Sequence, residues 1–139
     1  MVYDQDASPP ATEPDPPEAI PFGWSIVLIF GWSATAVSFA AIWTTVRRLG
    51  LSTWWTGSIS HPQPVLRMIP FIIAGIVMVK LMRSSSTVAL ISTIGGVMLA
   101  VVGIIDLWPY HMIGIVELAV ALAITALSVL ALTQRSRPS

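Results

Sequence analysis

Four long apolar segments limit this chain to one class of fold. The first of them, Gly23–Val46, contains no charged residue, and as a helix it would be about 36 Å long. The hydrocarbon core of a bilayer is about 30 Å thick, so such a helix is long enough to cross it. The whole chain is 55% hydrophobic and 10% charged, whereas soluble domains carry about 25% charged residues. The sequence therefore predicts an all-α integral membrane protein with four transmembrane helices.

The predicted bundle covers residues 23–134, with spans at approximately 23–46, 65–82, 87–107 and 112–132. The second span is compromised, because Arg67 lies near its start, Pro70 in its first turns and Lys80 near its end. Long basic side chains can reach the membrane surface from a helix end, so a crossing is still expected here. A short basic tail, residues 135–139, follows the last span.

Residues 1–22 are predicted to be a disordered tail. They hold six of the eleven prolines and five of the seven acidic residues of the chain. Proline interrupts helices, and an acidic, proline-rich stretch has too little apolar surface to fold by itself. The segment also lacks the basic start of a secretory signal peptide. Two roles stay open for it: a solubilising tail, or a docking arm that becomes ordered on a partner.

Four crossings place both termini on one side of the membrane. The first loop and the turn between the third and fourth spans then share the opposite side. The polar and aromatic residues expected there are Arg47, Arg48, Trp54, Trp55, His61, Arg67, Asp106, Trp108, Tyr110, His111 and Glu117. Basic residues favour the cytoplasmic side, but four on the side of the termini against three on the other do not decide the orientation. The first span, with acids before it and Arg47–Arg48 after it, favours termini outside, whereas the basic C-terminal tail favours termini inside. We expect a multi-pass protein of the cell membrane with its termini in the cytoplasm.

Six aromatic residues are predicted to anchor the chain at the two membrane surfaces. Trp24 and Trp43 are 19 residues apart, which is roughly 28 Å along a helix and matches the distance between two interfacial belts. The pair Trp54–Trp55 lies in the first loop, where a short helix in the membrane plane would hold both indoles at headgroup depth. A contact with a soluble partner is the alternative. Trp108 and Tyr110 occupy the last turn.

Small residues form three stripes at helical spacing. Such stripes let helix backbones approach closely, which drives helix association in membranes. The stripes are Gly31, Ala34, Ser38, Ala41 and Thr45 in the first span, Ser92, Gly96, Ala100 and Gly103 in the third, and Gly114, Glu117 and Ala121 in the fourth. Each stripe serves either packing within one four-helix bundle or docking onto another subunit.

Glu117 is a lone carboxyl group early in the last apolar span. A charge at membrane depth costs about 2.5–3.5 kcal/mol on insertion scales, so it has a partner or a function. The first interpretation is a buried polar anchor paired with Arg67 or Arg47. The others are a carboxylate that couples transport to a proton or cation, and a contact to a basic group on a partner subunit.

No other pattern predicts chemistry. The chain has no cysteine, and its two histidines, His61 and His111, lie in a loop and at a helix edge. Asp106 and Glu117 are eleven residues apart across a proline turn, without a third ligand in a recognisable metal motif. Nucleotide-binding and nucleophile motifs are also missing. We therefore expect no enzyme activity, no metal or other cofactor and no nucleic-acid partner.

The chain resembles small four-helix membrane proteins of actinobacteria in its acidic, proline-rich lead (Ser8–Glu18), its Ala/Val/Ile/Gly-rich spans and its Arg-Ser-Arg-Pro tail at 135–138. Among these it is similar to the accessory subunits of mycobacterial Mce-type lipid transporters. The resemblance implies a non-catalytic subunit that binds other integral membrane subunits and lipid. The alternative is a small homo-oligomeric transporter that uses Glu117 to couple transport to a proton or cation.

Overall fold

A computed structural model describes residues 20–57, 64–83 and 86–135 of the chain. These residues form helices and turns with no strand among them, so the predicted all-α class is confirmed. The helices are α1 (Phe22–Arg48), α2 (Pro64–Arg67), α3 (Ile69–Met82), α4 (Val88–Asp106) and α5 (His111–Arg135).

Three of these helices are long and apolar enough to cross a membrane. They are α1, α4 and α5, whose apolar stretches run over Phe22–Arg48, Val88–Asp106 and His111–Gln134. Helix α3 is equally apolar but has only 14 residues, which gives a length of about 21 Å. The fold is therefore that of a membrane-embedded helical protein with three full-length spans and one shorter apolar helix.

Pro70 explains why the second apolar segment is divided. It lies at the start of α3, where its missing N–H is tolerated. In a continuous helix its ring would clash with the carbonyl group of Leu66 and leave that group without a donor. The chain instead makes the short turn α2, and the amide of Ile72 restarts the helical pattern by donating to the carbonyl oxygen of Met68 at 2.7 Å.

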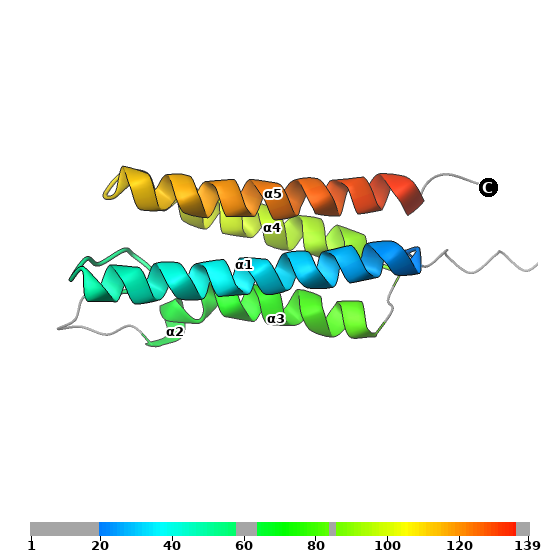
Figure 1. Ribbon diagram of the computed structural model, residues 1–139, viewed down its shortest axis with the longest axis horizontal. Helices are drawn as coiled ribbons and strands as arrows, with labels where there is room; N and C mark the ends of the chain where they lie inside the picture. The colour runs from blue at the N-terminus through cyan, green and yellow to red at the C-terminus, as the bar shows by residue number, and fades with distance from the viewer. Residues whose placement is uncertain (1–19, 58–63, 84–85, 136–139) are drawn as a thin grey trace, which may run out of the picture.

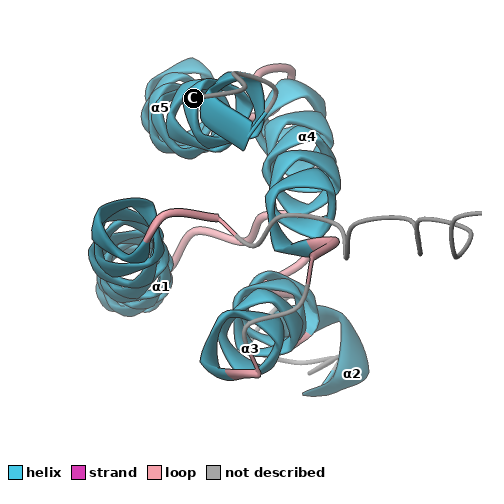
Figure 2. Cartoon of the chain, turned by 90° about the vertical axis from the view of Figure 1, so that its right-hand side faces the viewer, coloured by secondary structure: helices cyan, strands magenta, loops and turns pink. Residues whose placement is uncertain are grey.

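Helices α1, α3, α4 and α5 run alternately in opposite directions and form a ring. Helix α1 packs against α3 and α5, and α4 packs against α3 and, most extensively, against α5 (Figure 2). The start of α1 and the end of α5 lie at one end of the bundle, whereas the loop after α1, α2 and the α4–α5 turn lie at the other (Figure 1). This second end is called the loop end below.

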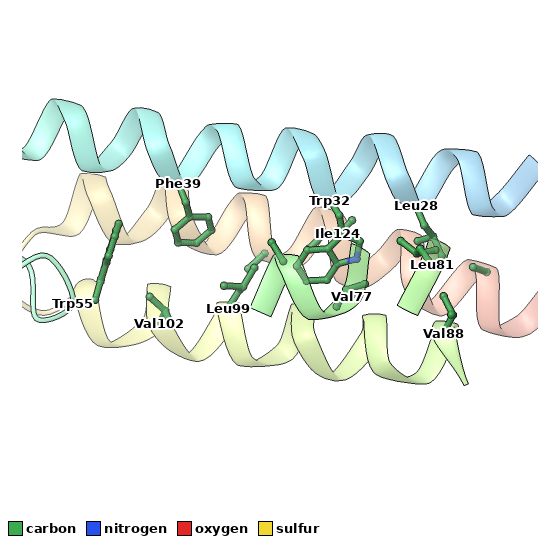
Figure 3. Packing of buried hydrophobic residues seen from close by; sticks show 13 residues of the cluster. Leu28, Trp32, Phe39, Trp55, Val77, Leu81, Val88, Leu99, Val102 and Ile124 are labelled. Atoms are coloured by element: carbon green, nitrogen blue, oxygen red, sulfur yellow. The ribbon is translucent and has the colours of Figure 1, made fainter. Parts of the chain in front are cut away.

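The core is a row of buried side chains along the axis of the bundle. Helix α1 contributes Leu28, Trp32, Thr35 and Phe39, whose spacing of three and four residues places them on one face. Figure 3 shows Leu28, Trp32 and Phe39 of α1 above side chains of α4, with Trp55 at the loop end of the row.

Several predictions fall partly outside the described residues. Residues 1–19 of the predicted tail lie outside them, while Phe22, its last residue, already begins α1. Of the basic tail, residues 136–139 lie outside, and Arg135 ends α5. His61 also lies outside the described ranges.

Candidate functional site

The loop after α1 folds back into the bundle. Gly50 has a φ of 68°, a conformation open to glycine, and the amide of Leu51 donates to the carbonyl oxygen of Val46 to close the turn. A second turn follows at 53–56, where the amide of Thr53 donates to Oγ1 of Thr56 at 2.9 Å. Nε of Arg67 in α2 donates to the carbonyl oxygen of Thr56 at 2.8 Å. Arg67 thus links the loop to α2.

This fold inserts Trp55 into the core. Its side chain is 0% exposed, and its ring lies 6.0 Å from that of Phe39 in a tilted arrangement (Figure 3). The prediction that Trp54–Trp55 form a short helix in the membrane plane is wrong for these residues, because the segment is a turn. Trp55 is a core residue and no interfacial anchor, since the loop turns it inward.

The indole of Trp55 contacts the carboxyl group of Glu117. Its Nε1 donates to Oε1 of Glu117 at 3.1 Å. The second neighbour of this group is Asp106, the last residue of α4, whose carboxyl group lies within hydrogen-bonding reach of that of Glu117. The side chains of Asp106 and Glu117 are both 0% exposed. We call these two residues the acid pair.

The acid pair lacks donors when both groups are ionised. Oδ1 and Oδ2 of Asp106 and Oε2 of Glu117 are buried without a hydrogen-bond partner. The backbone amide of Trp54 and the indole of Trp55 face Asp106 but do not meet hydrogen-bond geometry. Each buried polar group left in this state costs about 1–3 kcal/mol, and a charged one costs more. A proton shared between the two carboxyl groups, or a cation bound between them, would remove this cost.

The predicted ion pairs of Glu117 do not form. The sequence predicts Arg67 or Arg47 as its partner, but the guanidinium of Arg67 bonds the loop, and that of Arg47 lies over the ring of Trp43 at 5.8 Å. The loop after α1 places the indole of Trp55 against the carboxyl group of Glu117, in the position that the basic partner was expected to occupy.

Asp106 is the site residue that the sequence analysis placed on the same side as Glu117 but did not assign as its neighbour. The seven acidic residues comprise five in the first 22 positions and these two. Gly114 shares a helix face with Glu117, and it packs directly on the backbone of Asp106. The combination of two remaining acids on either side of one tight turn was the available signal. Within the described ranges, no three His, Cys, Asp or Glu side chains gather as a metal site.

Helices α4 and α5 approach each other through their small residues. A Cβ on Gly103 would lie 2.7 Å from the backbone nitrogen of Leu118, and one on Gly114 would lie 2.5 Å from that of Leu107. A Cβ on Gly96 would overlap Thr125. The remaining members of these two stripes are Ser92 and Ala121, both buried, and Ala100, which is half-buried.

A chain of hydrogen bonds crosses the middle of the bundle. Nε1 of Trp32 in α1 donates to Oγ of Ser92 in α4 at 2.7 Å, and Oγ of Ser92 lies 2.7 Å from Oγ of Ser128 in α5. The hydroxyl group of Ser128 donates its hydrogen to the carbonyl oxygen of Ile124 in its own helix. Ser92 is therefore the donor to Ser128, and both hydroxyl groups are satisfied.

The stripe of α1 is used only in part for packing within the chain. A Cβ on Gly31 would lie 2.8 Å from Cδ1 of Ile124 in α5, whereas Ala34, Ala41 and Thr45 are exposed. Two adjoining cavities of about 440 and 230 Å³ open between α1 and α5 and share Ser38 and Val120 in their lining. The stripe residues in the lining are Gly31, Ala34, Ser38, Ala41 and Thr45. We call this the α1–α5 groove; apolar side chains such as Val116 and Leu127 form its other wall.

The remaining aromatic residues differ in exposure. Trp108 is 92% exposed at the α4–α5 turn, as an interfacial residue would be. Trp24, Trp43, Trp54 and Tyr110 are half-buried. The indole nitrogens of Trp43 and Trp54 are buried without a partner in the part of the chain that the structure describes.

Comparisons of the chain with protein-family models, with curated proteins and with solved structures gave no match. The resemblance to accessory subunits of lipid transporters therefore stays a prediction from composition and helix pattern.

Proposed function

We propose that this protein is a non-catalytic subunit of a larger complex in the cell membrane. It crosses the membrane four times, with α2 and α3 together forming the second crossing and both termini in the cytoplasm. Other integral membrane subunits hold it through the α1–α5 groove.

The observation that carries the proposal is the exposed part of the stripe of α1. Ala34, Ala41 and Thr45 are exposed, although residues of this kind are the ones that let helices pack closely in a membrane. The stripes of α4 and α5 pack against each other, whereas that of α1 packs on α5 at Gly31 and lines the open groove along its length.

A transmembrane helix of another subunit fits this groove. From Gly31 to Thr45 the stripe extends about 21 Å, most of the thickness of a bilayer core. Small side chains allow a partner backbone to come close, and the hydroxyl groups of Ser38 and Thr45 lie along the same path. A lipid chain or a second copy of this protein are the competing occupants.

Basic residues support the orientation. Lys80 and Arg83 lie at the end of α3, and Arg135 ends α5 at the same end of the bundle as the start of α1 (Figure 1). Arg47, Arg48 and Arg67 are at the loop end, and Arg137 of the sequence lies outside the described residues. The basic C-terminal tail favours cytoplasmic termini.

The test is native purification in mild detergent followed by mass spectrometry. We expect an unrelated membrane protein in stoichiometric amount with the wild type, and its loss with A34L/A41L, which fills the groove. The control A119L/A126L adds the same volume to exposed positions of α5 outside the groove lining. Recovery of the chain alone or with only its own copies, or an equal loss with the control, would contradict the proposal.

The complex we expect moves lipid or another hydrophobic substrate. This part of the proposal follows the resemblance to Mce-type accessory subunits and the apolar lining of the groove. Deletion of the protein should reduce uptake of that substrate without abolishing it, because an accessory subunit tunes or stabilises the transporter. Complete loss of uptake while the partner subunits remain assembled would argue for a direct part in transport.

The acid pair favours a second candidate, the small homo-oligomeric transporter. Two buried carboxyl groups in contact could couple a substrate to a proton or cation. Reconstitution of the purified chain in liposomes separates the two candidates. Proton-dependent uptake that E117Q abolishes would support the transporter, and the accessory subunit alone should give no flux.

A further inference from the structure

The acid pair has three oxygen atoms that need a positively charged or protonated neighbour. Both carboxyl groups are fully buried, and no donor in the described part of the chain reaches Oδ1 or Oδ2 of Asp106 or Oε2 of Glu117. The single donor to the pair is Nε1 of Trp55, which bonds Oε1 of Glu117. A proton or a cation at the contact between the two groups would satisfy these oxygen atoms.

The carboxyl groups of Asp106 and Glu117 are within hydrogen-bonding reach of each other. Divalent cations such as Mg²⁺ and Ca²⁺ take about six or more oxygen ligands, including waters. The pair supplies two carboxyl groups, and no third His, Cys, Asp or Glu of the described residues joins them. A proton needs only one donor oxygen and one acceptor oxygen, as in other pairs of acids that share a proton.

We propose that Asp106 and Glu117 form a binding site for one proton, and that this proton keeps the 51–57 loop closed over the loop end of the bundle. With the proton bound, one carboxyl group donates to the other and the pair carries a single negative charge. That charge faces the indole N–H of Trp55. The site does not depend on the partner subunit proposed above.

Loss of the proton opens the loop. Hydroxide from the adjacent aqueous side removes the proton to give water, and two carboxylates remain in contact without a donor between them. Their repulsion and their need for water both favour separation. Trp55 is the cover that must leave before water can enter, because its indole lies directly on Glu117. The loop then releases Thr53 and Thr56, which are buried in the closed form.

Other charged or titratable groups at this end are differently engaged. Arg67 of α2 holds the carbonyl group of Thr56, and Arg47 of α1 lies over Trp43. His111 of α5 is exposed, and Tyr110 is half-buried. Residues 51–57 contain no titratable side chain. No lysine or arginine donates to the three orphan oxygens, so none of these groups replaces the proton.

Single cysteines report the opening of the loop, because the natural chain has none. T53C places a thiol at a buried position, and S52C places one at the exposed neighbour. The ratio of their maleimide labelling rates in liposomes removes the intrinsic effect of pH on thiols. We expect this ratio to rise about tenfold per pH unit, the slope for one proton, as the pH approaches the point at which the closed pair loses its proton, and to level off above that point.

E117Q and D106N serve as matched variants. In each, an amide N–H donates permanently to the remaining carboxylate and imitates the protonated pair. The labelling ratio should then stay low and independent of pH. The infrared band of a protonated carboxyl group, present in the wild type at neutral pH, should be missing in both variants.

Three results would overturn the proposal. The first is a labelling ratio of the wild type that does not change with pH. The second is a pH dependence that persists in both E117Q and D106N, with the bundle still helical. The third is a ratio that follows sodium or calcium concentration at constant pH, which would identify a metal ion as the ligand.

Discussion

At the scale of single residues, Ser92 joins three helices through one hydroxyl group. It accepts a hydrogen bond from Trp32 of α1 and donates to Ser128 of α5. Since lipid offers no competing donors, both neighbours would lose their only partner across the bundle without it. The hydrogen-bond chain therefore fixes the rotation of α1 relative to the α4–α5 pair.

We predict that S92A destabilises the bundle by about 1–3 kcal/mol, because it leaves the indole of Trp32 and the hydroxyl of Ser128 short of a buried partner. Equilibrium unfolding in mixed detergent micelles measures the change. T93A is the control, since Thr93 bonds only the carbonyl oxygen of Ala89 in its own helix. In the W32F background the effect of S92A should shrink; an undiminished effect would show that the hydrogen bond is not its cause.

The partner of Glu117 shows where sequence reasoning reaches its limit at this scale. Helical periodicity places Gly114, Glu117 and Ala121 on one face, and the structure has this face against α4. It does not identify the residue opposite, because Trp55 comes from a loop with no periodic pattern. The direction of that loop depends on Gly50 and on the Thr53–Thr56 turn, which sequence spacing does not predict.

At the scale of helices, α4 and α5 form the tightest unit of the molecule. Gly103 and Gly114 have no room for a Cβ because backbone of the facing helix or of the turn occupies that space, and at Gly96 the side chain of Thr125 occupies it. Apolar length predicts α1, α4 and α5 well, since a long uncharged run in lipid has few alternatives to a helix. The length of the apolar segment does not predict the break between α2 and α3 at Met68. Whether the helix bends or breaks there depends on how neighbouring helices accommodate Pro70.

We predict that G103A lowers the free energy of unfolding by about 1–3 kcal/mol, because the added methyl group forces two backbones apart. G75A is a matched control in α3, where a Cβ would meet nothing within 4 Å. It should be neutral or stabilise the helix by up to about 1 kcal/mol. Thermal unfolding followed by circular dichroism compares the two, and equal effects would contradict the close approach of α4 and α5.

At the scale of the whole molecule, the four long helices alternate in direction around a ring, although α3 is shorter than the others (Figure 2). The loop end gathers Ser52, the acid pair and the exposed Trp108, and the opposite end gathers the start of α1 and the end of α3. A short helix is accommodated when the bilayer thins locally or basic side chains reach outward, as Lys80 and Arg83 can at the end of α3.

Four single-cysteine variants test whether α3 crosses the membrane. The positions Phe22, Ser52, Arg83 and Trp108 are all exposed. If α3 crosses, an impermeant maleimide should label S52C and W108C from one side of oriented vesicles, and F22C and R83C from the other. If α3 remains on one side, the chain direction of α4 and α5 reverses, so S52C and R83C would react together and W108C would react with F22C. Whether S52C is labelled from the same side as W108C or from the same side as R83C therefore decides between four crossings and three.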